Sequence, residues 1–355
     1  MDAKSLTGEG SRSLSLLGAM GLGLMSLLMY LSGLLLWLTP LPLLYAYRRG
    51  GSTKALAGTL LPVAVLAAIY FFLLPFALDR FGAEQALKLF FWVPGLGVSP
   101  GDISWNPAVF GIAYYLLFAL IGVLLGEFES QPYSTTRLVG QTALITGGCL
   151  TLWLALYTWG AWAEFIQGLE GYFVSMIDGI TKMPPANEEM QAQWSLLQGH
   201  SADIAYYAVR LLPAMIFNML LFVIWLNIVV ARRLFAAWGG FFPFLGALKN
   251  WRLSFAGVWT VIAFAFLWLF DAYVLKWEWL KIASINAFIV FALVYFFQGL
   301  AIVAFYLQRW SLSPMIRLVF YAMLVLFFQP LSFLLVAFGF FDSWFDFRKL
   351  VPKAT

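Results

Sequence analysis

The polar residues that could do chemistry in this chain are mostly neutral amides set in long apolar runs. Gln141, Asn218, Asn286 and Gln298 each lie inside such a run. Amides that face a cavity in the middle of a membrane could hydrogen-bond a small neutral or zwitterionic solute. Amides between membrane helices also bond neighbouring helices, at about 0.6 kcal/mol per contact, and this structural role is the competing interpretation. We therefore treat these four residues as ligand-binding candidates.

Gln298 is the strongest of these candidates, because the neighbouring Gly299 allows a backbone or a ligand to approach closely. Asn218 cannot share a cavity with Asn227 on a regular helix. The two residues are nine positions apart, and at about 100° per residue they lie on opposite helix faces. A site that contains Asn218 is therefore expected to exclude Asn227.

Several kinds of chemistry are excluded by the residue types that are scarce. Cys149 is the only cysteine and His200 the only histidine, so the chain has neither a cysteine framework nor a histidine-rich zinc motif. The sequence also lacks a nucleotide-binding P-loop. We therefore expect no metal, no cofactor and no enzymatic activity. A membrane enzyme that uses loop residues such as Asp102, Glu164 or His200 is the least favoured alternative.

Composition places these residues in a membrane protein. Of 355 residues, 63% are apolar and 11% are charged, against about 45–50% and about 25% in soluble domains. The net charge of +4 does not indicate nucleic-acid binding, because Lys and Arg mark cytoplasmic loops in membrane proteins. The expected surroundings are a lipid bilayer and no nucleic acid.

Uncharged runs between charged residues delimit the membrane spans, since a helix needs about 20 apolar residues to cross. The runs predict an all-α, polytopic integral membrane protein with eight or nine transmembrane helices. The expected spans are 13–31, 33–47, 55–78, 108–126, 138–163, 211–231, 253–270, 283–307 and 318–341. None of these interiors contains a charged residue, which argues against a proton pump or a voltage sensor.

Two local features qualify this list of spans. Pro40 and Pro42 interrupt the second span, and such a break occurs beside transporter sites and equally in plain hairpin turns. Glu127 and Glu129 follow the fourth span and are expected in a solvated loop.

The distribution of Lys and Arg predicts an N-terminus in the cytoplasm, although the basic residues near the end of the chain fit this orientation less well. We expect one membrane domain over 1–355. It would have a cytoplasmic 1–12 segment, an acidic and amphipathic extracytoplasmic excursion over 164–210, and an aromatic and charged tail over 342–355.

Two patterns could contact protein partners. Ser15, Ala19 and Gly23 form a ridge of small residues that permits close helix packing, against either this chain or a separate subunit. In the tail, Asp342, Asp346 and Arg348 lie among aromatic residues. The tail is interpreted either as an aromatic belt at the membrane interface or as a docking site.

Several short phrases together resemble the YybS-like family of predicted bacterial inner-membrane proteins. The phrases are Pro40-Leu41-Pro42 with Arg48-Arg49-Gly50, Leu226-Asn227 before Ala231-Arg232-Arg233-Leu234, Asn250-Trp251-Arg252-Leu253, Phe297-Gln298-Gly299-Leu300 and the run 339–348. The resemblance implies a multi-pass protein of the bacterial inner membrane. In its general appearance the sequence is similar to substrate-binding subunits of energy-coupling-factor transporters and to MreD-type proteins. The resemblance supplies no catalytic residues.

Two functions remain as hypotheses. The first is a solute-binding or transport subunit, which would need a separate energising ATPase because this chain has no nucleotide motif of its own. The alternative is a non-catalytic membrane scaffold that recruits cell-envelope or division proteins, in keeping with the small-residue ridge and the aromatic tail.

Overall fold

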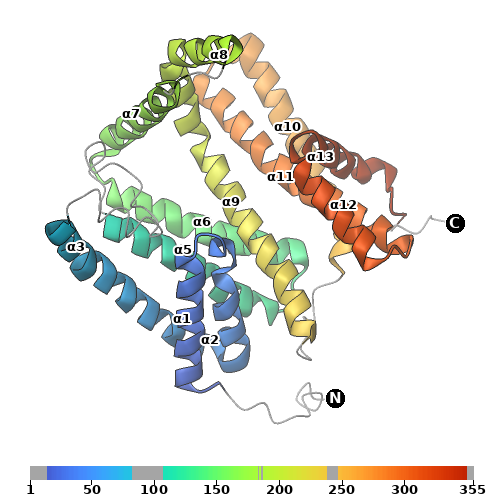
Figure 1. Cartoon of the computed structure of the whole chain (residues 1–355). Helices are drawn as coiled ribbons and strands as arrows, with labels where there is room; N and C mark the ends of the chain where they lie inside the picture. Colours follow the sequence, from blue (N-terminus) through green and yellow to red (C-terminus); the bar gives the residue numbers. More distant parts are fainter. Residues whose placement is uncertain (1–13, 82–106, 183, 185–186, 238–246, 350–355) are drawn as a thin grey trace. The chain divides into compact units, whose positions relative to one another are not determined.

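The structure of the chain is a computed structural model (Figure 1). It describes residues 14–81, 107–182, 184, 187–237 and 247–349. Every element in these ranges is a helix, with no strand among them. Seven of the described helical stretches are long and apolar enough to cross a membrane, and two shorter apolar helices accompany them. The all-α, polytopic membrane class is therefore confirmed.

The chain divides into two compact units, and each is described by itself. Unit 1 comprises 1–133, 138–176 and 221–244, whereas unit 2 comprises 134–137, 177–220 and 245–355. Helix α9 (Ser201–Ala237) contributes its first part to unit 2 and its remainder to unit 1.

Helix α2 organises unit 1, because both α1 and α5 pack against it. The helices of this unit are α1 (Leu16–Leu31), α2 (Pro40–Ala68), α3 (Leu74–Phe81), α5 (Pro107–Glu129), α6 (Thr135–Tyr157) and most of α7 (Trp162–Thr181). A π-helical turn, Ile69–Leu73, joins α2 to α3. The three central helices bury the apolar core of the unit.

The interruption predicted at Pro40 and Pro42 lies instead at Gly51. The two prolines begin α2, where proline is tolerated because the first turn of a helix has no partner for its backbone N–H. Gly51 has a φ of 74° inside the helical stretch, a conformation that glycine adopts readily. The segments expected as a second and a third span are thus one bent helical stretch, Leu36–Arg80.

The ridge of small residues on α1 packs within the chain. Ser15 caps the helix by accepting a hydrogen bond from the Gly18 N–H at 3.0 Å. Further along, Ala19 is fully buried, and a Cβ atom added to Gly23 would overlap the carbonyl group of Gly58 on α2. The ridge therefore brings the backbones of α1 and α2 into contact.

Two side chains bond the backbone where α1 gives way to α2. Ser26 donates to the Thr39 carbonyl oxygen at 2.8 Å. Asn227 donates to the Trp37 carbonyl oxygen at 2.7 Å and is itself fully buried. Trp37 lies in a 3₁₀ turn just before Pro40, which has no N–H to donate, so the Asn227 amide supplies a partner for its carbonyl group. The Thr39 carbonyl group belongs to the N-cap of α2, and Ser26 adds a bond from α1 to it.

Unit 2 is built around α11 (Glu278–Arg309), which runs alongside α10 (Ala256–Phe270) and α13 (Phe328–Phe345) (Figure 1). Its other helices are α8 (Glu188–Gly199), α12 (Pro314–Leu326), the last residues of α7 and the first part of α9. The π-helical turn Asp271–Leu275 leads out of α10. Helix α11 therefore contacts the other long helices of this unit.

The ninth span expected from the sequence is split in the structure. Phe327 ends α12 and precedes α13, so the expected 318–341 span becomes two helices. Helix α13 continues to Phe345 and includes the buried Asp342. The prediction that no span interior holds a charged residue is therefore wrong for α13, since Asp342 lies inside a stretch apolar enough to cross the membrane.

The acidic segment 164–210 is largely helical. It contains most of α7, all of α8 and the start of α9. Asn187 caps α8 by accepting a hydrogen bond from the Met190 N–H at 2.8 Å. Glu188 and Glu189 occupy the first turn, where negative charge interacts favourably with the helix dipole. The side of the membrane on which this segment lies stays a prediction.

Glycines allow α11 and α13 to cross in backbone contact. A Cβ atom added to Gly299 would overlap the carbonyl group of Leu335, and one added to Gly339 would overlap that of Tyr295. The close approach expected beside Gln298 is thus a contact with another helix of the same unit.

We expect Gly339→Leu to destabilise the protein by about 1–3 kcal/mol, because a larger side chain at this crossing must push the helices apart. Gly148→Leu is the matched control, since nothing lies within 4 Å of a Cβ atom added there. Thermal unfolding of the purified proteins in detergent measures the difference. Equal melting temperatures for the two variants would contradict the described crossing.

Candidate functional site

Asn286 forms hydrogen bonds with two backbone groups of α9 beside a proline. Its Nδ2 donates to the Arg210 carbonyl oxygen, and its Oδ1 accepts from the Ala214 N–H, both at 3.0 Å. A regular helix pairs these two backbone groups with each other, and the adjacent Pro213 disturbs that ladder. The Nδ2 also donates to Ile282 within α11 at 2.9 Å. Both ends of this amide are therefore bonded within the chain.

Gln298 is fully buried and is also bonded at both ends. Its Oε1 accepts from the Leu253 N–H at 3.0 Å, and its Nε2 donates to Asp342 Oδ2 at 3.2 Å. The residue chosen from the sequence as the strongest solute ligand thus lies in a network of internal hydrogen bonds.

This network centres on a buried ion pair. Asp342 and Arg348 side chains are both 0% exposed, and Arg348 Nη2 lies 2.7 Å from Asp342 Oδ2. Arg348 Nη1 donates to the carbonyl oxygens of Lys249 and Trp251 at 2.8 and 2.9 Å. The charges that could have docked a partner are instead inside unit 2, where they hold the tail against the segment before α10.

Asp346 makes a second, more exposed link in the tail. Its Oδ1 lies 3.5 Å from Arg252 Nη1, and its backbone has a positive φ of 41°. This left-handed residue ends α13 and turns the chain back so that Arg348 reaches Asp342. The exposed residues in the described part of the tail are the aromatic Trp344 and Phe345 and the charged Lys349.

Gln141 is the one ligand candidate that belongs to unit 1. It lies on α6 in unit 1, and its Oε1 is buried without a partner among the residues that the structure describes. No cavity described in the structure is lined by Gln141. Of the ligand candidates in unit 2, Asn286 and Gln298 line neither of the described hollows.

Asn218 faces a groove in unit 2. Its Nδ2 donates to the Ile289 carbonyl oxygen on α11 at 2.9 Å, whereas its buried Oδ1 has no partner within the described part of the chain. The groove has a volume of about 660 Å³. Its walls are aromatic and aliphatic side chains of α10, α11 and α13, among them Val261, Ile289, Phe296, Phe333, Val336 and Phe340.

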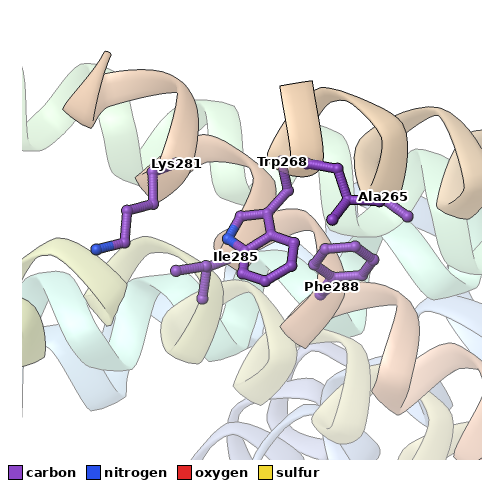
Figure 2. Close-up of a pocket in the computed structure, with 6 residues that line it drawn as sticks. Ala265, Trp268, Lys281, Ile285 and Phe288 are labelled. Carbon is purple, nitrogen blue, oxygen red and sulfur yellow. The ribbon is translucent and has the colours of Figure 1, made fainter. Parts of the chain in front are cut away.

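A second hollow of about 450 Å³ adjoins this groove along α11. Figure 2 shows Lys281, Ile285 and Phe288 of α11 beside Ala265 and Trp268 of α10. Phe288 lines both hollows, so the two share a wall. Lys281 is the one charged residue in the lining of either.

The groove suits a mostly apolar ligand. Binding sites for small molecules commonly have volumes of about 300–1,000 Å³, with apolar walls and a few placed polar groups. Here the polar residues of the groove are Asn218, Tyr295 and Ser332, and the adjoining hollow is lined by apolar surface that includes the aliphatic stem of Lys281. A hydrophilic solute would find too few partners to replace its water.

Sequence reasoning identified Asn218 but missed the walls and Lys281. Apolar residues that face lipid and those that face a ligand have the same composition, so the groove cannot be recognised from residue types alone. The sequence did contain one signal for this part of α11. Lys281, Ile285 and Phe288 are spaced at i, i+4 and i+7, which places a cationic side chain and two apolar side chains on one helix face.

Unit 1 contains a polar cluster whose position the sequence analysis did not predict. Glu129 is only 7% exposed, and its Oε1 lies 3.1 Å from Arg48 Nη1. Glu127 bonds the Tyr47 hydroxyl, and Arg48 stacks over Phe235. The prediction of a solvated loop is wrong for Glu129, because α2 places a guanidinium group beside it.

Two of the loop residues considered for interfacial enzyme chemistry lie in the described part of the chain, Glu164 in unit 1 and His200 in unit 2. His200 lies 3.7 Å from Asp203, and both side chains are largely exposed. Glu164 lies in the first turn of α7. Asp102 falls outside the described residues. The described ranges hold no group of His, Cys, Asp or Glu that could bind a metal ion.

We expect Arg348→Met to cost about 3–5 kcal/mol of stability, because it leaves the Asp342 charge buried and unpaired. The double variant Asp342→Leu/Arg348→Met should recover part of this loss. The neighbouring, exposed Lys349→Met is the control. Chemical unfolding in detergent provides the measurement, and equal stability of Arg348→Met and Lys349→Met would refute the buried pair.

Comparison with known proteins identifies a family. No curated protein and no solved structure matches this chain. A family model of predicted membrane proteins matches residues 55–343. The match includes every residue that lines the groove, and the YybS-like resemblance stays a prediction beside it. Since the match covers most of the sequence, the chain belongs to the DUF2232 family of predicted membrane proteins.

Proposed function

We propose that this protein binds a mostly apolar, amphipathic molecule from the bilayer in the groove along α11. The observation that carries the proposal is Asn218, which lines an apolar groove of about 660 Å³ and whose buried Oδ1 has no partner in the described residues. A buried acceptor without a partner costs free energy. A ligand that donates one hydrogen bond there would recover it.

This proposal narrows the solute class expected from the sequence. Asn286 and Gln298, which were expected to bond a neutral or zwitterionic solute, are bonded to the chain itself. The groove walls come almost entirely from aromatic and aliphatic residues. Transfer of apolar surface into such a site is therefore the main driving force, and the amide sets the orientation.

In this role the protein acts as a binding protein or as the membrane subunit of a transporter. The sequence has no P-loop, so energised transport would use a separate ATPase. The proposed setting is a bacterial inner membrane with the N-terminus in the cytoplasm, because Lys and Arg favour the segments that this orientation places inside.

The alternative role is a scaffold, and α12 is the feature that favours it. This helix has no buried residue, and Met315, Leu318 and Val325 are 76%, 69% and 75% exposed. Such a surface contacts either lipid or a partner helix. A scaffold would use this helix together with the exposed aromatic side chains of the tail.

Photo-crosslinking in native membranes tests the groove directly. Benzoyl-phenylalanine replaces Phe296, which lines the groove, or Phe266 on α10, which is 64% exposed and lines neither hollow. We expect an adduct of one discrete small-molecule mass at 296 and a mixture of bulk lipids at 266. The same mixture at both positions would contradict the proposal, and a protein adduct at 296 would favour the scaffold.

The Asn218 acceptor is tested with Asn218→Leu in the background that carries the crosslinker at 296. We expect about tenfold less adduct per folded molecule, the effect of losing roughly one hydrogen bond. Asn286→Leu is the control, because Asn286 also links α9 to α11 but does not line the groove. An equal loss in both variants would mean that helix packing, and not the Asn218 oxygen, holds the ligand.

A further inference from the structure

We infer that the molecule bound in the groove along α11 is a hydroxylated aromatic compound of the phenol class with an apolar remainder. This inference rests on the proposed function and names the chemistry of the ligand. It is carried by the hydrogen bonds that the polar residues of the groove make and lack, and by the aromatic character of the groove walls.

Asn218 requires a hydrogen-bond donor from the ligand. Its Nδ2 donates to the Ile289 carbonyl oxygen at 2.9 Å. This bond fixes the orientation of the amide group, because the opposite orientation would set two carbonyl oxygens against each other. The buried Oδ1 has no partner among the described residues, and a carbonyl oxygen can only accept. A hydroxyl group satisfies this oxygen, whereas an ester, an ether, a ketone or a plain hydrocarbon does not.

The other polar residues of the groove set a weaker condition on the ligand. Tyr295 is 2% exposed, and its hydroxyl oxygen has no partner within the described ranges. A hydroxyl group both donates and accepts, so Tyr295 takes a polar atom of either kind. Ser332 already donates its hydroxyl to the Gln329 carbonyl oxygen within α13 at 2.9 Å. The condition that selects among ligands therefore comes from Asn218.

The walls of the groove favour a ring over a straight chain. Eight of the sixteen residues that line it are aromatic, against 19% of the whole chain, and all eight belong to α11 and α13. Tyr295 meets Phe340 edge to face with ring centres 5.1 Å apart, and Phe296 meets Phe328 in a similar arrangement at 5.8 Å. An aromatic ligand extends such packing between rings, whereas a saturated chain does not.

Surface of these rings is available for contact. Phe328 and Phe333 are 58% and 75% exposed although both line the groove. Both lie on α13, a helix long and apolar enough to cross a membrane. A phenol with an apolar remainder dissolves in the bilayer and reaches these rings from it. Its hydroxyl group adds a single heavy atom at the ring edge, and this suits a buried oxygen better than a bulky polar head group, which would lose more hydration.

Photo-crosslinking to added probes tests the inference. The full-length protein with benzoyl-phenylalanine in place of Phe296 is illuminated in membranes that contain equal amounts of 4-nonylphenol and its methyl ether, 4-nonylanisole. Mass spectrometry measures the ratio of the two adducts, and the same ratio at the exposed position of Phe266 corrects for the reactivity of the probes. We expect the corrected ratio to favour the phenol about tenfold, the effect of one hydrogen bond.

A second pair of probes tests the ring. The methyl ether is replaced by the straight-chain alcohol that has the same number of carbon atoms as 4-nonylphenol, so that both probes carry a hydroxyl group. We expect the corrected ratio to favour the phenol about fivefold, the effect of one added contact between aromatic rings.

Asn218→Leu identifies the acceptor. In this variant we expect the phenol and its methyl ether to crosslink equally at position 296, because the oxygen that distinguishes them is absent. Asn286→Leu is the matched control, since Asn286 also joins α9 to α11 but does not line the groove. This control should keep the tenfold preference.

The outcomes separate this inference from the proposed function. Equal corrected yields of the phenol and its ether, or of the phenol and the straight-chain alcohol, overturn the inference. Loss of the preference in both Asn218→Leu and Asn286→Leu overturns it as well. The proposed function survives each of these results if position 296 gives a discrete adduct without added probe. If that position captures only bulk lipids and also shows no preference among the probes, both proposals fail together.

Discussion

Backbone groups freed by interruptions in helices must find partners inside the membrane, and unit 2 is held together by the side chains that bond them. Without water in the hydrocarbon core, an unbonded carbonyl or N–H group costs several kcal/mol. Asn286 bonds the backbone of α9 at Arg210 and Ala214. Gln298 bonds the N–H of Leu253, and Arg348 bonds two carbonyl groups just before it. Each of these side chains also joins its own segment to another segment of the unit.

This use of polar groups limits what remains for a ligand. The groove keeps Asn218 and Tyr295, each with a buried oxygen that has no partner among the described residues, within largely apolar walls. Such a site recognises a molecule chiefly by shape and by the burial of apolar surface, with two polar contacts to orient it. The amphipathic molecule proposed above has these properties.

Much of the fold could be predicted from the sequence, but little of the site. Composition and uncharged runs gave the helical membrane class, and Gly299 predicted a close backbone contact. The Asp342–Arg348 pair could not be foreseen, because it depends on the left-handed turn at Asp346 that brings the tail back. The groove escaped prediction for a different reason. The residues in its walls are of the same types as residues that face lipid. What makes them a groove is the placement of α10, α11 and α13, and residue types in a single sequence do not reveal that placement.

The position of Arg348 imposes an order on how the protein matures. The ribosome makes Lys249, Trp251 and Gln298 well before the arginine that completes their network, and a membrane protein is built from its N-terminus onward. The pair can close only in a chain that extends to residue 348, and a chain that stops shortly before Arg348 would keep the Asp342 carboxylate buried without its partner. The final closure of unit 2 thus depends on one of the last residues to be synthesised.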